Sequence, residues 1–366
     1  MKLFFIAGEA SGDQHASVVI EQIKKRNEST DIVCWGGDLM EAAGAKLLSH
    51  YKQRAIMGFI EVLKKIRTIK TLLNQAKKDI ETESPEVLIL VDNPGFNMPL
   101  AKFAKQKGIK VFWYIAPKVW AWNERRVKDL RKYVDKLFVI FPFEVDYFKN
   151  HNIHAHFVGN PTIKAVDEYT APSKNIKPLS SKKTIALLPG SRKNEVQSLL
   201  PIFLKTVQSR ENGEFEIFIA GAPGLDENFY SEILKDYQLT GNILFGQTFS
   251  ILYTCKVTEG YALVASGTAT LEAALFEVPQ IVAYKVSPLT YWLGKSLIGI
   301  KFVSLVNILL GYGLIEEHLQ KVNKVTLNNA IIRLISNKSK IADGYKELRG
   351  ILNVEHESVV DLILEK

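Results

Sequence analysis

The chain has 366 residues, of which 47% are hydrophobic and 23% are charged, and its formal net charge is +8. A chain of this length is too long to fold around a single hydrophobic core, so we expect two domains of roughly 150 to 200 residues. Only Cys34 and Cys255 are present, which excludes a disulfide framework. Cys34 lies in an apolar run and is expected to be inert. The positive charge suits phosphorylated ligands or an anionic membrane surface.

No segment reaches the roughly 18 uncharged apolar residues that a membrane-spanning helix needs. The nearest candidate, residues 289–315, is interrupted by Lys295, Lys301 and several glycines, which favours packed helices and loops. The first strand begins at Lys2 without a cleavable signal pattern. A reduced, cytoplasmic location is therefore expected.

Short β-rich runs alternate with helical patterns along the chain, which is typical of parallel α/β architecture. The expected strands are residues 2–7, 31–35, 87–92, 110–115, 136–141, 155–158, 184–188, 215–220, 242–245, 261–265 and 280–285. Residues 170–183 are polar and contain two prolines, as a linker does. The expected division is a first domain at 1–165, a linker at 166–183, a second domain at 184–340 and C-terminal helices at 341–366.

The first strand leads into a tight loop, Gly8-Glu-Ala-Ser-Gly-Asp13, and then into a helix expected from Gln14 to about Lys25. The spacing of Gly8 and Gly12 is not the dinucleotide fingerprint, and the strand at 31–35 ends without an acid for a ribose. A nicotinamide cofactor is therefore disfavoured.

The turn Ser266-Gly-Thr268 joins a buried strand directly to a helix. Free N–H groups and the positive end of the helix dipole favour a phosphate at such a turn. Glu272, about one helical turn further on, can accept hydrogen bonds from the vicinal hydroxyls of a sugar. Phosphate plus ribose indicates a nucleotide, with an ordinary helix N-cap as the alternative.

A second anion site is predicted after the strand at 184–188. Pro189-Gly-Ser-Arg192 precedes a helix expected from about Asn194, and Arg192 can bridge a diphosphate through two hydrogen bonds. The alternative is a surface arginine after a turn.

Six motifs follow one another in a family-specific order. They are Gly8-Glu-Ala-Ser-Gly-Asp13, Met57-Gly-Phe-Ile-Glu-Val62, Asp92-Asn-Pro-Gly-Phe-Asn97, Pro117-Lys-Val-Trp-Ala-Trp122, Leu188-Pro-Gly-Ser-Arg192 and Ser266-Gly-Thr-Ala-Thr-Leu-Glu272. With these motifs the chain resembles the lipid-A-disaccharide synthase family over nearly its whole length.

The resemblance implies an inverting GT-B glycosyltransferase with two facing Rossmann-like domains and an interdomain cleft. The implied reaction transfers 2,3-diacylglucosamine from UDP-2,3-diacylglucosamine to 2,3-diacylglucosamine 1-phosphate. Its products are the β-1,6 disaccharide 1-phosphate and UDP. The resemblance also implies that the last helix, about residues 354–365, packs back on the first domain.

Attack on the anomeric carbon requires a base for the acceptor hydroxyl. Asp92 closes the buried run at 87–91, where a carboxylate is costly unless it is paired or used, so Asp92 is the first candidate. Asp13 and Glu9 are rivals, and a purely structural cap over residues 96–97 is the alternative for Asp92. The family often has a second acid where this chain has Gly95, and a histidine where it has Asn160, so the role of position 160 stays open.

Ligands of open parallel sheets lie beyond the carboxyl ends of the strands. We therefore expect UDP on the second domain, and the resemblance adds Asn307 to its contacts, with a plain helix N-cap as the alternative. The expected donor residues are Gly190, Ser191, Arg192, Ser266, Gly267, Thr268, Glu272 and Asn307.

The first domain is expected to face the acceptor, and the lipid substrate that the resemblance implies places this domain at the anionic cytoplasmic surface of the inner membrane. Tryptophans beside cations suit an interfacial anchor, although solvated helix faces look similar. The expected residues are Ser11, Gly12, Met57, Phe59, Lys64, Trp120, Trp122, Arg125 and Arg126.

No metal or other cofactor is expected. His151, His154 and His156 bridge a polar loop and a strand without a cysteine nearby, and Arg192 with backbone amides can replace Mg²⁺. The chain has no nucleic-acid module, phosphate-binding P-loop or hydrolase elbow. Two other functions stay open: a UDP-sugar 2-epimerase of the same fold, and a non-catalytic protein that binds nucleotide sugars or lipid phosphates.

Overall fold

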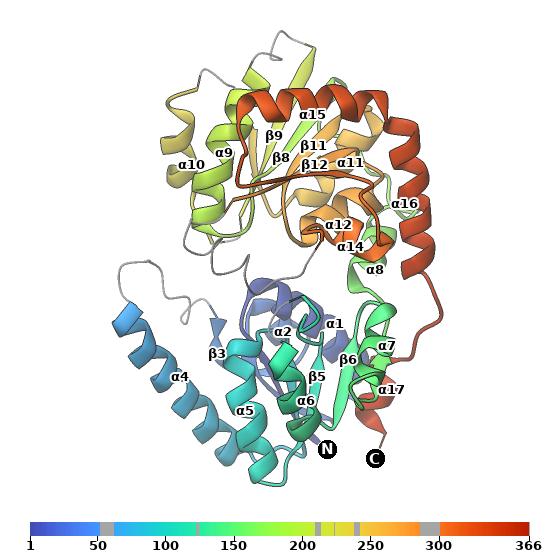
Figure 1. Ribbon diagram of the computed structural model, residues 1–366. Coiled ribbons are helices and arrows are strands. Elements are labelled where there is room, and N and C mark those ends of the chain that lie inside the picture. Colours follow the sequence, from blue (N-terminus) through green and yellow to red (C-terminus); the bar gives the residue numbers. More distant parts are fainter. Residues whose placement is uncertain are drawn as a thin grey trace. The chain divides into compact units, whose positions relative to one another are not determined.

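The structure of the chain is a computed structural model (Figure 1). It describes residues 1–51, 62–121, 124–208, 214–222, 224–237, 242–285 and 301–365, with the backbone alone for residues 62–67. Two compact units form: unit 1 is Met1–Pro161 with Val354–Lys366, and unit 2 is Thr162–Asn353. Four predicted site features lie outside the described part, namely Met57, Phe59, Trp122 and the side chain of Lys64.

Unit 1 contains a seven-stranded parallel sheet in the order β3-β2-β1-β4-β5-β6-β7. The strands are β1 (Lys2–Ala7), β2 (Asp31–Gly36), β3 (Lys46–His50), β4 (Val87–Val91), β5 (Lys110–Tyr114), β6 (Lys136–Val139) and β7 (Ala155–Phe157). The described helices are α1 (Ala10–Arg26), α2 (Asp38–Ala42), α4 (Val62–Glu83), α5 (Pro94–Gln106), η1 (Glu124–Arg126), α6 (Val127–Tyr133), α7 (Phe143–Lys149) and α17 (Val359–Leu364).

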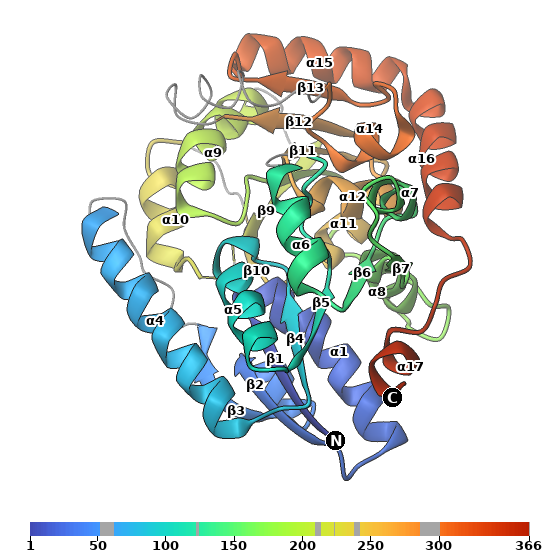
Figure 2. The ribbon, with the colours of Figure 1, turned by 60° about the horizontal axis from the view of Figure 1, so that its bottom comes forward.

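Alternation along β1 divides the apolar core of unit 1 between the two faces of the sheet. Phe4 and Ile6 point into one core, and Phe5 points into the other, which α1 and α17 cover. α17 lies beside α1, where Asp361 pairs with Arg26 (Figure 2). The helix near the end of the chain thus covers part of the sheet on which the chain begins.

Unit 2 contains a six-stranded parallel sheet in the order β10-β9-β8-β11-β12-β13. The strands are β8 (Lys183–Leu188), β9 (Phe215–Gly221), β10 (Asn242–Phe245), β11 (Tyr261–Ala265), β12 (Gln280–Tyr284) and β13 (Glu316–Leu319). The described helices are α8 (Pro161–Tyr169), α9 (Lys193–Val207), α10 (Glu227–Leu234), α11 (Thr248–Val257), α12 (Thr268–Leu275), α14 (Leu305–Leu310), α15 (Lys324–Ser336) and α16 (Lys338–Leu352). The expectation of two parallel α/β domains is confirmed.

Two edge strands were absent from the sequence-based prediction. β3 and β13 each pair with one neighbour, and their side chains are mostly only partly buried. An edge strand can carry polar residues such as the Glu-Glu-His-Leu of β13 and so lacks the apolar run of a central strand. The last helix was also predicted too long, since α17 begins at Val359.

The loop after β1 is shorter than predicted, because α1 begins at Ala10 and not at Gln14. Asp13 therefore lies on the helix, and it is only 2% exposed. Its carboxylate accepts hydrogen bonds from the backbone N–H groups of Gly37 (2.7 Å), Leu39 (3.2 Å) and Met40 (3.2 Å). Asp13 thus ties the end of β2 and the start of α2 to α1.

Asp13→Asn is expected to destabilise unit 1, because the amide loses the charge and one of the two accepting oxygens. The loss of charge-assisted hydrogen bonds in a buried place costs about 2 to 3 kcal/mol. Urea unfolding followed by tryptophan fluorescence measures this, since four of the five tryptophans lie in unit 1. Glu9→Gln, at an exposed position one residue before the helix, is the control and should keep the parent midpoint. Equal midpoints for both variants would contradict the assignment.

Candidate functional site

Unit 2 brings the two loops predicted to bind phosphate to the same edge of its sheet. β8 and β11 are neighbouring parallel strands in which Leu188 lies opposite Val264. Residues 189–192 follow one strand and lead into α9, and residues 266–267 follow the other and lead into α12. Two loops and two helix N-termini therefore adjoin at the carboxyl ends of adjacent strands, where an anion is favoured.

The start of α12 is not an ordinary side-chain N-cap. Gly267 occupies the N-cap position, and no side chain among the described residues caps this helix. The Ser266 hydroxyl donates instead to the carbonyl of Val303 at 2.8 Å. Gly267 and Thr268 are exposed, so the first turn of α12 is accessible to a ligand.

In the loop at residues 189–192, backbone N–H groups already donate to a carboxylate of the protein, that of Glu195. Glu195 Oε2 accepts hydrogen bonds from the backbone N–H groups of Ser191 (3.1 Å) and Arg192 (3.3 Å). Gly190, at φ +117°, allows this approach, because a Cβ there would lie 2.5 Å from Glu195 Oε2. The Arg192 side chain is 73% exposed, with its guanidinium 3.4 Å from Glu195 Oε1.

Glu195 changes how this loop can bind a diphosphate. The expectation that its backbone amides are open to an anion is wrong for the described state, in which the exposed Arg192 guanidinium is the accessible group. Sequence reasoning missed Glu195, although an acid three residues after a turn residue is the spacing of a capping box.

Glu272 is the second acid beside this edge of the sheet. It lies one helical turn into α12, and its side chain is partly buried. Desolvation raises the pKa of its carboxyl group to about 7. No described residue forms a hydrogen bond or ion pair with this carboxylate, so its oxygens are available to accept hydrogen bonds from hydroxyl groups.

Asn307 has a structural role that the sequence did not predict. Its side chain is 1% exposed and its amide donates to the carbonyl of Ile315 (2.9 Å) and to Glu317 (2.8 Å). Its oxygen accepts from the N–H groups of Leu314 (2.9 Å) and Ile315 (3.0 Å), so its hydrogen-bonding capacity is used within the protein. The expectation that Asn307 lines the donor site is not supported, and the N-cap of α14 is Ser304.

Unit 1 has a corresponding pair of loops. β1 and β4 are neighbours with Ala7 opposite Val91, so the segment from Gly8 and the turn at Asp92 follow adjacent strand ends. Asp92 lies after β4 and is exposed. The premise that this carboxylate is buried was therefore wrong. The N–H groups of Phe96 and Asn97 both donate to the backbone carbonyl of Asn93.

The other residues predicted on the acceptor side differ in their exposure to solvent. Glu9 and Ser11 are exposed next to the end of β1, whereas Gly12 and Asp13 are buried. Arg125 is exposed and Arg126 is partly buried, on η1. Asn160 is 6% exposed, and its amide donates to the carbonyl of Ile140 at 3.3 Å.

The side chain of Trp120 forms a hydrogen bond and a ring contact within unit 1. Its indole N–H donates to Glu144 Oε1 at 2.8 Å, and its ring meets Phe143 edge-on at 5.0 Å. Glu144 is 1% exposed, and burial raises its pKa to about 7. An interfacial anchor keeps its indole N–H in the wet headgroup layer, so the expected anchoring role of Trp120 is not supported. No described helix is long and apolar enough to cross a membrane.

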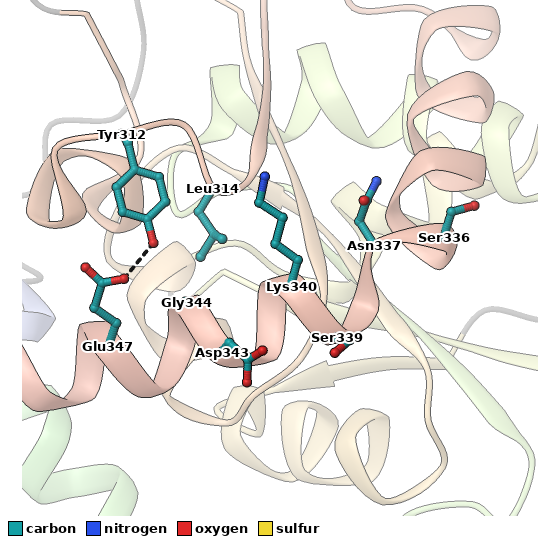
Figure 3. A pocket seen from close by; sticks show the side chains of 9 residues that line it. All are labelled: Tyr312, Leu314, Ser336, Asn337, Ser339, Lys340, Asp343, Gly344 and Glu347. Carbon is teal, nitrogen blue, oxygen red and sulfur yellow. Dashed lines mark hydrogen bonds between the residues drawn. The ribbon is translucent and has the colours of Figure 1, made fainter.

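A cavity of about 570 Å³ lies on unit 2 between the segment after α14 and helix α16 (Figure 3). Tyr312 bridges it by donating to Glu347 at 2.7 Å. Lys340, Asp343 and Glu347 give its wall both charges, and none of the predicted site residues lines it. This mixed wall favours no single class of ligand.

Two of the three clustered histidines, His151 and His156, lie next to carboxylates of the protein. A ring nitrogen of His151 lies 3.0 Å from Glu124, and one of His156 lies 3.0 Å from Glu357. Within the described ranges, no three or more His, Cys, Asp or Glu side chains gather as metal ligands do.

The raised pKa of Glu272 predicts a pH-dependent affinity for UDP. Hydroxyl donors favour the ionised carboxylate, so affinity should rise by about tenfold between about pH 5.5 and about pH 8. Glu272→Gln should show only the smaller rise that UDP's own phosphate contributes. Isothermal titration of both proteins across this range measures the difference. Parallel pH profiles would contradict the assignment of Glu272 to the ribose.

A family model described as lipid-A-disaccharide synthetase matches residues 3–360 of the chain. The lipid-A-disaccharide synthase of Nitrosococcus oceani is 36% identical over 321 residues, covering 86% of this chain and 82% of the relative. That of Francisella philomiragia is 33% identical, with the whole of both chains covered.

The solved structures that match are more distant. UDP-GlcNAc 2-epimerase from Neisseria meningitidis, bound to UDP-GlcNAc, has a TM-score of 0.64 at 13% identity and covers 98% of this chain and 96% of its own. The kitacinnamycin glycotransferase has a TM-score of 0.63 at 14% identity, with 99% and 97% covered. At such identities the likeness concerns the fold alone.

Proposed function

Because the chain belongs to the lipid-A-disaccharide synthase family and is a glycosyltransferase, we propose that it joins two acylated glucosamines. The donor is UDP-2,3-diacylglucosamine and the acceptor is 2,3-diacylglucosamine 1-phosphate. The products are the β-1,6 disaccharide 1-phosphate and UDP. The epimerase alternative has only structural likeness at low identity, whereas the relatives named as synthases reach 33 to 36%.

The observation that carries the donor half of this proposal is the Glu272 carboxylate. A partly buried carboxylate that has no partner among the described residues is costly, and a ligand with two adjacent hydroxyls would satisfy it. It lies one turn beyond the start of α12, where Gly267 is the N-cap, so a ribose on Glu272 leaves the diphosphate at Ser266, Gly267 and Thr268. Arg192, with Gly190 and Ser191 shaping its loop, supplies the positive charge, and the proposal includes no metal.

Asp92 is the base in this proposal. Its carboxylate is exposed at the end of a central strand, and its rival Asp13 is occupied by three backbone N–H groups. Glu9 is exposed on the neighbouring loop and is the remaining alternative. We place the acceptor on unit 1, next to Asp92 and Ser11.

The function is tested by incubating the protein with UDP-diacylglucosamine, with and without diacylglucosamine 1-phosphate. UDP and disaccharide should form only when the acceptor is present, whereas an epimerase would release UDP and free sugar without it. Asp92→Asn keeps the shape but cannot take the proton, so it should lower kcat by about 10² to 10⁴ while UDP affinity stays unchanged. Parent-like turnover by this variant would remove Asp92 as the base, and Glu9→Gln would be tested next.

We further propose that unit 1 binds the anionic surface on which the lipid acceptor resides. Lys64, Arg125 and Arg126 belong to segments with an excess of cations, and each cation near such a surface contributes about 1 kcal/mol.

Removal of two cations by Arg125→Gln combined with Arg126→Gln should therefore weaken binding to vesicles of anionic phospholipid, measured by sedimentation, by about 30-fold at low salt. The matched control is Lys321→Gln with Lys324→Gln, which removes two exposed charges from unit 2. Binding in all three proteins should fall as salt rises, because charge attraction is screened. An equal loss in both double variants would assign the effect to net charge and contradict a specific surface on unit 1.

A further inference from the structure

The turn that presents Asp92 has an unusual backbone. Asp92 and Asn93 are consecutive and both left-handed, with φ values of +45° and +43°. Non-glycine residues adopt this conformation singly and at a cost, and Asp and Asn are the types that tolerate it best. Two in succession persist only when surrounding contacts hold them.

Asn97, in the first turns of α5, supplies such a contact. Its amide nitrogen donates to the carbonyl of Asp92 at 2.8 Å and to the carbonyl of Val91 at 3.1 Å. Exchanging the amide nitrogen and oxygen would place an oxygen against two carbonyl oxygens, so the hydrogen-bond network fixes the orientation. One side chain therefore links the last residue of β4 and the first residue of the turn.

The neighbouring strands hold the same turn from other sides. The Asp92 N–H donates to the carbonyl of Tyr114, at the end of β5, at 3.1 Å. The Asn93 amide lies against Gly8, where an added Cβ would be 2.3 Å from the amide nitrogen. Unlike these two contacts, the Asn97 side chain binds the Asp92 carbonyl. It therefore fixes the plane of the peptide bond between Asp92 and Asn93.

Packing alone does not explain an asparagine at this position. The side chain is fully buried, and its oxygen has no hydrogen-bond partner in the described part of the chain. An unsatisfied buried acceptor is destabilising, and an apolar residue would avoid it. What an apolar residue lacks is the pair of donors aimed at the two carbonyls.

We propose that Asn97 is a positioning residue for the transfer reaction, which sets the direction of the Asp92 carboxylate by holding the left-handed turn at 92–93. The inference rests on the proposed function, in which Asp92 takes the proton of the acceptor hydroxyl. A base must lie within hydrogen-bond reach of that proton, so a small rotation of the turn lowers the rate without removing the base.

Asn97→Asp is the sharpest test, since it keeps the shape and replaces both donors with an oxygen that repels the carbonyls. It should lower kcat by about 10- to 100-fold, the loss that follows a displacement of about 1 Å. The KM for the UDP-sugar and the affinity for UDP should stay at the parent values, because these report on unit 2. Asn97→Ala removes the donors without adding an acceptor and serves if the Asp variant does not fold. Asn150→Asp, the same change at an exposed position in unit 1, should keep the parent kcat.

A double-mutant cycle with Asp92→Asn separates positioning from a general structural role. If Asn97 acts through Asp92, Asn97→Asp should change kcat by less than about threefold in the Asp92→Asn background. An equal loss of kcat in both backgrounds, or a parent-like kcat for both Asn97 variants, would overturn the inference while the base assignment stands. A parent-like kcat for Asp92→Asn alone would remove the base assignment, and the inference with it.

Discussion

Both sheets reverse their strand order at one pair of neighbours, and the candidate sites depend on this topology. In unit 1 the reversal lies between β1 and β4, and in unit 2 it lies between β8 and β11. The connections from two such strands run to opposite faces of the sheet, which leaves the loops at their carboxyl ends uncovered. The turn at Asp92 and the start of α12 each follow one of these strands, so parallel pairing brings together chemistry that lies far apart in the sequence.

The strands that create these sites were predictable because they are central. A strand buried on both faces, such as Val87-Leu-Ile-Leu-Val91, reads as an unbroken apolar run, and the polar residues that follow it mark the edge of the sheet. The loops at 190–192 and 266–268 were found in this way. The edge strands β3 and β13 were missed because their sequences, Lys-Leu-Leu-Ser-His and Glu-Glu-His-Leu, have no such run, whereas the other two edge strands, β7 and β10, were predicted.

Which polar side chains face a ligand was much less predictable. Asp13, Asn307 and Glu195 stand in or near loops expected to bind ligands, yet each accepts backbone N–H groups of its own unit. The donors of Asp13 come from residues 37–40, which only the parallel pairing of β1 and β2 brings close. Sequence spacing cannot reveal such donors, because the oxygens that bind a ligand and those that hold a loop belong to the same residue types.

Glu195 and Glu272, the two glutamates beside the loops at 189–192 and 266–267, show how this difference affects the free energy of the protein. Glu195 already has two backbone donors, whereas Glu272 has none among the described residues, and the pKa of Glu272 rises to about 7. A carboxyl group whose folded pKa exceeds its unfolded value near 4.5 stabilises the fold fully below pH 4.5, and this stabilisation is lost as pH rises to about 7. The loss is on the order of 1 to 3 kcal/mol after allowance for partial exposure. Above pH 7 the unliganded protein therefore keeps a poorly solvated carboxylate, and hydroxyl donors of a nucleotide would recover part of that energy on binding. Such recovery favours ligands with vicinal hydroxyls over free diphosphate, which is the selectivity that a nucleotide-sugar donor site needs.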